Sequence, residues 1–314
     1  MKFRLLPILL FPLVAAHADT FGSGANTFTM NFVDIGNAGN AVDDTGYGSV
    51  GYTYRMGVNE VSRGMIDAYN ALSGGPTLTM YDYAAGGVTG GNLAARSATG
   101  ISWNEAARFV NWLNTSSGYS AAYKFTTSGF NDNIALWTIS DSGYNAANPF
   151  RNANAHYYLP SEDEWYKAAY YDPNKSGGAG YWNYATGSDT APTAVASGTT
   201  SGTAVYGQSF TGPADITNAG GLSAYGTMAQ NGNVWEWGES GFTAPNDSAG
   251  ESGVIRGGAW NSTSGNLASS SRNSLSPSSE SSFAGFRVAA VPEPSAFLLT
   301  LIGTLGVVLR RKRG

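Results

Sequence analysis

The stretch from Tyr225 to Trp260 constrains the fold more than any other part of the chain. It holds two short motifs, Gly-Asn-Val-Trp-Glu-Trp at residues 232–237 and Ile-Arg-Gly-Gly-Ala-Trp at residues 255–260. Tryptophans bury a large apolar area, a buried carboxylate needs a cation or donors, and glycines let two backbone segments approach closely. We therefore predict a compact, closely packed region of irregular backbone. Its structural residues are Trp235, Trp237, Arg256, Gly257 and Gly258.

Composition favours a loop-rich globular protein. The 314 residues suit one large domain or two small ones, and 42% hydrophobic residues are enough for a core. Forty-two glycines and a charged fraction of 12% indicate stabilisation by aromatic side chains and turns instead of long helices. The sequence contains no cysteine, which excludes disulfides, thiolate metal sites and a cysteine nucleophile.

Local patterns predict a few regular elements. Alternating residues predict a strand, and a serine N-cap before apolar residues at helical spacing predicts a helix. Ser102 with Glu105, and Ser161 with Glu164, have the spacing of capping boxes. The patterns predict a strand over residues 28–33 and helices over residues 62–72, 102–114 and 161–171.

The N-terminus has the pattern of a secretory signal peptide over residues 1–18. Basic residues precede an apolar run over residues 5–15, and Ala16-His17-Ala18 has the small-x-small form of a cleavage site. A membrane anchor is the alternative, but the apolar run is too short to span a bilayer. Residues 19–51 then form a strand and loop segment rich in Gly, Asn, Thr and Asp.

The C-terminus carries a second targeting pattern over residues 291–314. Pro292, Glu293 and Pro294 precede an apolar run over residues 296–309 and a basic cluster over residues 310–313. This order resembles the bacterial PEP-CTERM sorting signal. The resemblance implies transient anchoring in the inner membrane as a short transmembrane helix, with the basic cluster cytoplasmic. It also implies release by an exosortase-type protease to the cell surface, outer envelope or extracellular matrix of a Gram-negative-type bacterium; a plain tail anchor is the alternative.

Removing both ends leaves an acidic domain. Between Asp19 and Val291, 11 Lys and Arg stand against 21 Asp and Glu, which gives a net charge of −10. Such a domain has no diffuse basic face for nucleic acid or anionic membrane. Cations or neutral sugars are easier partners.

The motifs together resemble the formylglycine-generating enzyme, or sulfatase-modifying factor, family. The two motifs above are followed by Gly-Phe-Arg-Val at residues 285–288, which contains Arg287, and are preceded by matching segments at residues 59–62, 101–106 and 158–165. The resemblance covers residues 52–290. It implies an α+β domain with a C-type-lectin-like fold, with short strands, a few helices and much ordered loop.

The resemblance also implies calcium near the first motif. Gly232 and Val234 would supply carbonyl oxygens and Glu236 a carboxylate, but Ala229 stands where the family has an acid or amide. Hard cations prefer six to eight oxygen ligands, so the loss weakens such a site. The alternative is that Glu236 pairs with Arg256 or Arg287. For a second family calcium, Asn183 and Asp215 are the available side chains.

The catalytic chemistry of the family is not supported by these residues. The resemblance implies two cysteines that bind copper after the Arg-Gly-Gly motif, but residues 260–267 contain none, and serine cannot replace a thiolate for Cu(I). Outside the predicted signal peptide the chain keeps one histidine, His156, so no histidine cluster for iron can form. We therefore expect no copper site.

We interpret the chain as a domain that has lost the family's catalytic thiols and recognises extracellular polysaccharide or an envelope protein. Trp260, Asn261 and Asn266 lie where the resemblance implies a substrate-binding face, and Trp stacking with Asn hydrogen bonds suits sugars. A core position is the alternative for Trp260. The competing function is an oxidoreductase of the same family with an altered active site, with Glu236 and Glu239 as the acidic groups left for catalysis.

Overall fold

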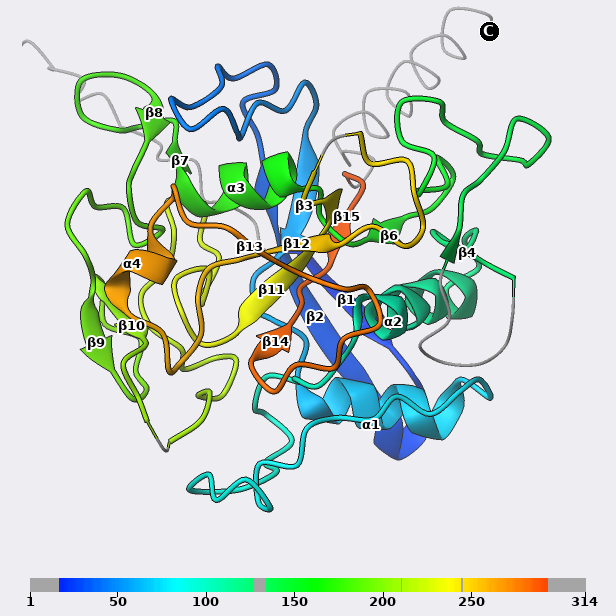
Figure 1. The fold of residues 1–314 in the computed structure, drawn as a ribbon, viewed down its shortest axis with the longest axis horizontal. Helices are drawn as coiled ribbons and strands as arrows, with labels where there is room; N and C mark the ends of the chain where they lie inside the picture. The colour runs from blue at the N-terminus through cyan, green and yellow to red at the C-terminus, as the bar shows by residue number, and fades with distance from the viewer. Residues whose placement is uncertain (1–16, 127–133, 210, 244, 293–314) are drawn as a thin grey trace, which may run out of the picture.

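The computed structural model describes residues 17–126, 134–209, 211–243 and 245–292 (Figure 1). These residues form short strands with few helices, a mixed sheet-rich fold. The helices are η1 (Gly24–Asn26), α1 (Arg63–Leu72), α2 (Trp103–Ser116), α3 (Glu162–Tyr170) and α4 (Ser264–Leu267). The strands are β1 (His17–Phe21), β2 (Phe28–Ile35), β3 (Tyr54–Gly57), β4 (Lys124–Phe125), β5 (Ile134–Ala135), β6 (Tyr157–Tyr158), β7 (Tyr171–Asp172), β8 (Gly180–Tyr181), β9 (Thr193–Val195), β10 (Thr203–Val205), β11 (Trp235–Gly241), β12 (Gly253–Arg256), β13 (Asn273–Leu275), β14 (Ala284–Gly285) and β15 (Ala289–Ala290).

The three predicted helices are confirmed, and each begins at its predicted serine. The Ser62 hydroxyl accepts a hydrogen bond from the Met65 amide at 3.3 Å. At α2 and α3 the capping boxes are complete, since serine and glutamate side chains each bond the other's backbone. The predicted strand over residues 28–33 is confirmed as β2, which extends to Ile35.

The larger sheet joins both ends of the described chain. Its strand order is β1-β2-β3-β15-β6, so β15, near the C-terminal end, lies between β3 and β6. His17 and Ala18 pair with Phe32 and Asn31 within β1 and β2. Residues 19–51 therefore contribute strands to this sheet.

The second sheet contains the two motifs singled out above. Its order is β13-β12-β11-β14, with β11 antiparallel to β12 and parallel to β14. In Figure 1, β11 and β12 lie near the centre of the view, with α3 above them, α1 below and α2 to the right. The motif that begins at Gly232 leads directly into β11.

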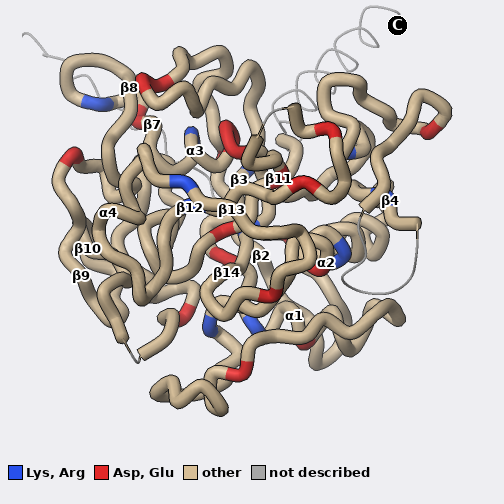
Figure 2. The backbone as a smooth tube through the Cα atoms, viewed as in Figure 1, with Lys and Arg blue, Asp and Glu red and all other residues tan. Residues whose placement is uncertain are grey.

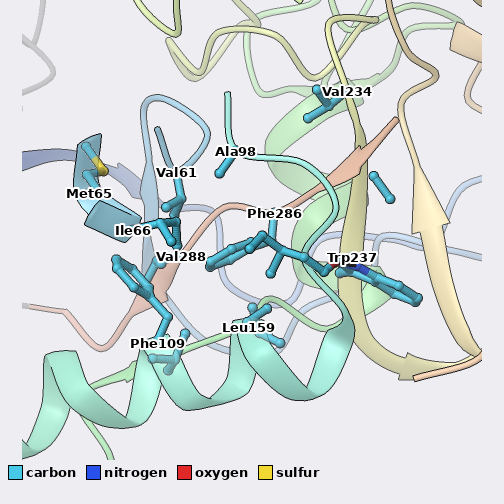
Figure 3. Packing of buried hydrophobic residues seen from close by; sticks show 14 of the residues in the cluster. Val61, Met65, Ile66, Ala98, Phe109, Leu159, Val234, Trp237, Phe286 and Val288 are labelled. Atoms are coloured by element: carbon cyan, nitrogen blue, oxygen red, sulfur yellow. Dashed lines mark hydrogen bonds between the residues drawn. The ribbon is translucent and has the colours of Figure 1, made fainter. Parts of the chain in front are cut away.

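Aromatic residues from both halves of the chain form the core. Phe109 on α2 packs edge-on against Phe286, with ring centroids 5.6 Å apart, and both are fully buried. Figure 3 shows these rings in one cluster with Ile66, Val288 and Trp237. The Trp237 ring nitrogen donates to the Ile101 carbonyl at 3.0 Å, so this buried polar atom is satisfied.

The buried side chain of Arg55 ties the two ends of the domain together. Its Nη2 lies 3.0 Å from the Asp19 carboxylate, and its Nε donates to the Val291 carbonyl at 3.0 Å. The predicted targeting segments are residues 1–18 and 291–314, and only residues 17–18 and 291–292 of them are among the described residues. Within the described ranges, no helix combines the length and apolarity needed to cross a bilayer.

Candidate functional site

The carboxylate of Glu236 is the centre of the first motif. Arg287 contacts it through Nε and Nη2, at 2.5 Å and 2.6 Å, and the Trp165 ring nitrogen donates to it at 2.7 Å. Glu236 is 1% exposed and Arg287 is fully buried. Arg287 also donates to the backbone carbonyls of Gly57 and Met228. Of the two predicted arginine partners, Arg287 is therefore the one that pairs with Glu236.

Arg256 makes a separate ion pair, although it lies opposite Glu236 in the register of β11 and β12. Its Nε donates to the Glu162 carboxylate at 2.7 Å, and Arg272 contacts the same carboxylate at 2.8 Å. Arg256 Nη1 also donates to the carbonyls of residues 269 and 271. Arg256 thus fastens α3 to the loop that follows α4.

The glycines of both motifs let the backbone segments touch. The Gly232 amide donates to the Gly257 carbonyl at 2.7 Å. Gly257 and Gly258 have φ values of +96° and +77°, in the left-handed region that favours glycine. A Cβ at Gly258 would lie 2.8 Å from the Leu267 side chain, so this position needs glycine for space as well.

Glu60 is a second buried carboxylate in this centre, and the sequence did not assign it a role. It is 1% exposed and accepts hydrogen bonds from the Ser97 hydroxyl, from Asn233 Nδ2 at 2.5 Å and from the Val234 amide at 3.3 Å. Burial raises the pKa of the Glu60 carboxyl to about 8; repulsion from Glu236 adds to the rise and Arg287 opposes it. The neighbouring residues Asn59, Val61 and Ser62 gave no sign of these partners, which come from distant parts of the chain.

The segment in the place of the family's catalytic cysteines forms the short helix α4 and its cap. The Asn266 side chain accepts hydrogen bonds from the Thr263 amide and hydroxyl, and Asn261 is exposed. Trp260 is 7% exposed and packs edge-on against Tyr83, with ring centroids 6.1 Å apart. The structure therefore places Trp260 in the core, Asn266 in a helix cap and Asn261 at the surface.

Comparison with known proteins identifies the domain. Residues 26–291 match the family described as sulfatase-modifying factor enzyme 1-like domain. The chain belongs to this family. The match begins at residue 26 instead of residue 52, as expected if β2 is part of the domain. No curated protein matches this chain.

Solved structures share the fold of this sulfatase-modifying-factor domain. Treponema denticola variable protein 1 is 21% identical, with a TM-score of 0.57 over 88% of this chain and 99% of that chain. CarF is 19% identical, with a TM-score of 0.57 over 84% of this chain and 99% of that chain. PvdO from Pseudomonas aeruginosa is 16% identical, with a TM-score of 0.49 over 87% of this chain and 98% of that chain. At these identities the similarity to the first two structures describes the fold alone.

The first motif does not fit the calcium that the family resemblance implies. Both oxygens of Glu236 are occupied by Arg287 and Trp165, and Ala229 brings no side-chain oxygen. A guanidinium against the carboxylate also repels a cation at that place. Gly232 and Val234 could then offer only backbone carbonyls. Among the described residues, no group of three or more His, Cys, Asp or Glu side chains has a metal-binding arrangement.

We therefore expect calcium to have no stabilising effect through this motif. Thermal unfolding of the protein in EDTA and in millimolar CaCl2 should give the same Tm, because a ligand that binds only the native state would raise it. Magnesium at the same concentration controls for ionic effects. A calcium-specific rise of several degrees that disappears in Glu236→Gln would show that Glu236 exchanges Arg287 for the ion.

The other acidic residue considered for catalysis, Glu239, is also engaged. Arg151 contacts it at 2.8 Å, Asn148 donates to it at 2.5 Å and the Tyr123 hydroxyl at 2.7 Å. The side chain is 4% exposed. Arg151 bridges Glu239 to Glu164, the capping residue of α3. These contacts fit a structural ion-pair network.

The raised pKa of Glu60 makes stability depend on pH. Because the folded-state pKa, about 8, exceeds the ordinary value of 4.5, the native state binds the proton more tightly than the unfolded state. This contribution to the free energy of unfolding is fully present below about pH 4.5 and is lost as the pH rises through 8. It amounts to a few kcal/mol.

Glu60→Gln should flatten this part of the pH profile. Urea unfolding of the wild type and the variant between pH 5 and pH 9 measures the difference. Glu251→Gln is the control and should keep the wild-type slope. An unchanged slope in Glu60→Gln would mean that the Glu60 carboxyl stays ionised throughout this range.

Proposed function

We propose that this protein is exported and acts as a non-catalytic recognition domain at the cell surface or in the extracellular matrix. Its partner would be extracellular polysaccharide or an envelope protein, presented to a C-type-lectin-like variant of the sulfatase-modifying-factor fold. One observation carries the proposal: a member of a family whose activity the resemblance assigns to two cysteines has no cysteine in its whole sequence. The chain therefore has no thiolate ligands for the copper ion that the oxidation of a substrate thiol would need.

The surroundings of the remaining reactive side chains support this proposal. The carboxylates of Glu236 and Glu239 are each paired with an arginine, whereas a residue that donates a proton to a substrate or takes one from it must reach that substrate. The ring of His156 stacks on Tyr119 with centroids 4.4 Å apart. Figure 2 shows acidic and basic residues scattered along the described backbone without a continuous basic stretch in that part of the chain, which supports a partner other than nucleic acid.

The recognition face we propose lies around α4. Asn261 offers an exposed amide there, and the Asn266 side chain accepts hydrogen bonds from Thr263 at the start of the helix. Trp260 would support this face from beneath, since its ring packs on Tyr83. Amide groups donate and accept hydrogen bonds with hydroxyls, as sugar recognition requires.

Calorimetric titration of the purified full chain with the producing organism's extracellular polysaccharide tests the proposal. We expect a saturable heat signal for the wild type. In Asn261→Ala the affinity should fall about tenfold, which corresponds to about 1.4 kcal/mol of binding free energy. Asn154→Ala, which changes an exposed asparagine before β6, should bind normally. Oxygen uptake with a thiol substrate would instead support the oxidoreductase alternative. Absence of binding to both polysaccharide and envelope proteins would remove the recognition function.

The sorting part of the proposal has its own test. Replacement of Pro292, Glu293 and Pro294 by alanine should retain the protein in the inner membrane, because the protease would lose its recognition sequence while the apolar run stays attached. Cell fractionation with an antibody to the domain measures the distribution. Export of the variant to the same place as the wild type would contradict sorting by this motif.

A further inference from the structure

A cavity of about 270 Å³ lies between the loop before α2, the residues that follow β9 and the segment that follows β10. It is close to the lower size limit of ligand pockets in proteins, about 300 Å³, and is open to solvent on one side. Two charged residues, Arg96 and Asp215, line it. The neutral polar side chains in its wall are Thr89, Ser197, Thr211 and Asn218.

Arg96 is a buried cation without a counter-ion in the described residues. It is 8% exposed, its Nη2 donates to the Thr89 carbonyl at 2.5 Å, and its Nη1 has no hydrogen-bond partner. No described carboxylate oxygen lies within 4.0 Å of its guanidinium. Three other buried arginines of the described chain, Arg55, Arg256 and Arg287, are paired with carboxylates, and the fourth, Arg63, lies close to Arg96. A buried charge without a partner is costly, so its retention indicates a use.

Positive charge is concentrated further by Arg63. The guanidinium groups of Arg63 and Arg96 lie 5.3 Å and 5.8 Å from the centroid of the Tyr83 ring. Arg63 donates to the Tyr81 carbonyl at 2.7 Å and has no carboxylate partner among the described residues. Tyr83 also contacts Trp260, so the cavity is linked by packing to the face proposed for recognition.

Asp215 brings an acceptor to the same cavity. It lies directly opposite Arg96 in an antiparallel β-bridge, an arrangement that puts both side chains on one side. Its carboxylate makes no hydrogen bond or ion pair with the described part of the chain, and it is more than 4.0 Å from the Arg96 guanidinium. Arg96 and Asp215 therefore line the same cavity without pairing with each other. A ligand with an anionic group for Arg96 and hydrogen-bond donors for Asp215 could bind between them.

We propose that this cavity binds an acidic sugar residue, a uronic acid unit of a polysaccharide. The sugar carboxylate would lie at Arg96, and ring hydroxyls would donate to Asp215 and exchange hydrogen bonds with Ser197 and Asn218. A compact dianion such as phosphate would be repelled by Asp215, whereas a neutral sugar would leave Arg96 without a counter-ion. This inference rests on the proposed function and adds the chemical class of its ligand.

Calorimetric titration of the full chain with sodium glucuronate, glucose, acetate and serine is the direct test. Glucuronate should bind at least tenfold tighter than each of the others, because only it combines a carboxylate with ring hydroxyls. Arg96→Gln should remove this preference and Asp215→Asn should weaken glucuronate binding. Arg108→Gln, which changes an arginine on α2 stacked on Phe125, is the matched control and should bind like the wild type.

Thermal unfolding separates a binding role of Arg96 from a structural one. Because Arg96→Gln removes an unpaired buried charge, its Tm should equal or exceed that of the wild type. A structural role would lower the Tm together with binding. Ser197→Trp, which fills the cavity from its exposed rim, should abolish glucuronate binding while Arg96 stays in place.

Each other outcome overturns the inference. Equal binding of glucuronate and glucose, tighter binding of acetate or serine, or full binding in Arg96→Gln or Ser197→Trp would contradict an acidic-sugar site here. If the extracellular polysaccharide still bound to both variants as to the wild type, the recognition function would stand and this cavity would not be its site. If the wild type bound neither glucuronate nor polysaccharide, both proposals would fall.

Discussion

Replacing Arg287 by methionine should lower the free energy of unfolding by about 3–5 kcal/mol. The substitution keeps an apolar side chain in the core but leaves the Glu236 carboxylate buried without its cation. It also removes the donors to the carbonyls of Gly57 and Met228, which are 2.9 Å and 2.7 Å away. Urea unfolding at pH 7 gives the difference directly, provided that the m-value is unchanged.

Arg272→Met is the matched control for Arg287→Met. Arg272 also pairs with a glutamate, but its side chain is 22% exposed, and Glu162 would keep Arg256 as a partner. The expected loss is therefore within about 1 kcal/mol. The double variant Glu236→Gln with Arg287→Met should lose less than the two single variants together, since the unpaired charge is gone. Equal losses in Arg287→Met and Arg272→Met would contradict the central role of the buried pair.

The three longer helices α1, α2 and α3 could be predicted from the sequence because their signals are local, whereas the short helices η1 and α4 were not predicted. Ser62, Ser102 and Ser161 each begin a helix with a side chain that bonds a backbone amide three residues later. Most strands could not be predicted, because several contain only two residues. The place of β15 depends on pairing with β3 and β6, which lie far away in the chain.

The candidate site was predictable in part for a related reason. The sequence shows that Glu236 needs a cation and offers Arg256 and Arg287, but the choice depends on tertiary structure. Arg287 reaches the carboxylate because β14 runs parallel to β11 and places Gly285 beside Glu236. Glu60 contacts Asn233, which is 173 positions away, so no local pattern could indicate it. The cavity at Arg96 likewise forms between segments distant in sequence.

Gly232→Ala should destabilise the domain by about 2–5 kcal/mol. Gly232 has a φ of +89°, which an L-residue with a Cβ adopts at a cost of about 1–2 kcal/mol. A Cβ at this position would also lie 2.2 Å from the Val205 carbonyl oxygen, so the backbone of β10 would have to move. That movement would strain the bond from the Gly232 amide to the Gly257 carbonyl, which joins the two motifs.

Gly207→Ala separates the two causes of this loss. Gly207 has a φ of +68°, but a Cβ there would meet no atom within 4 Å. Gly207→Ala should therefore lower the free energy of unfolding only by the cost of a positive φ in a residue with a Cβ, about 1–2 kcal/mol. The excess loss in Gly232→Ala, measured by urea unfolding of both variants, reports the close approach of the first motif to β10. Equal losses would mean that β10 yields without cost, and the two motifs would then be less tightly joined than their backbone contacts indicate.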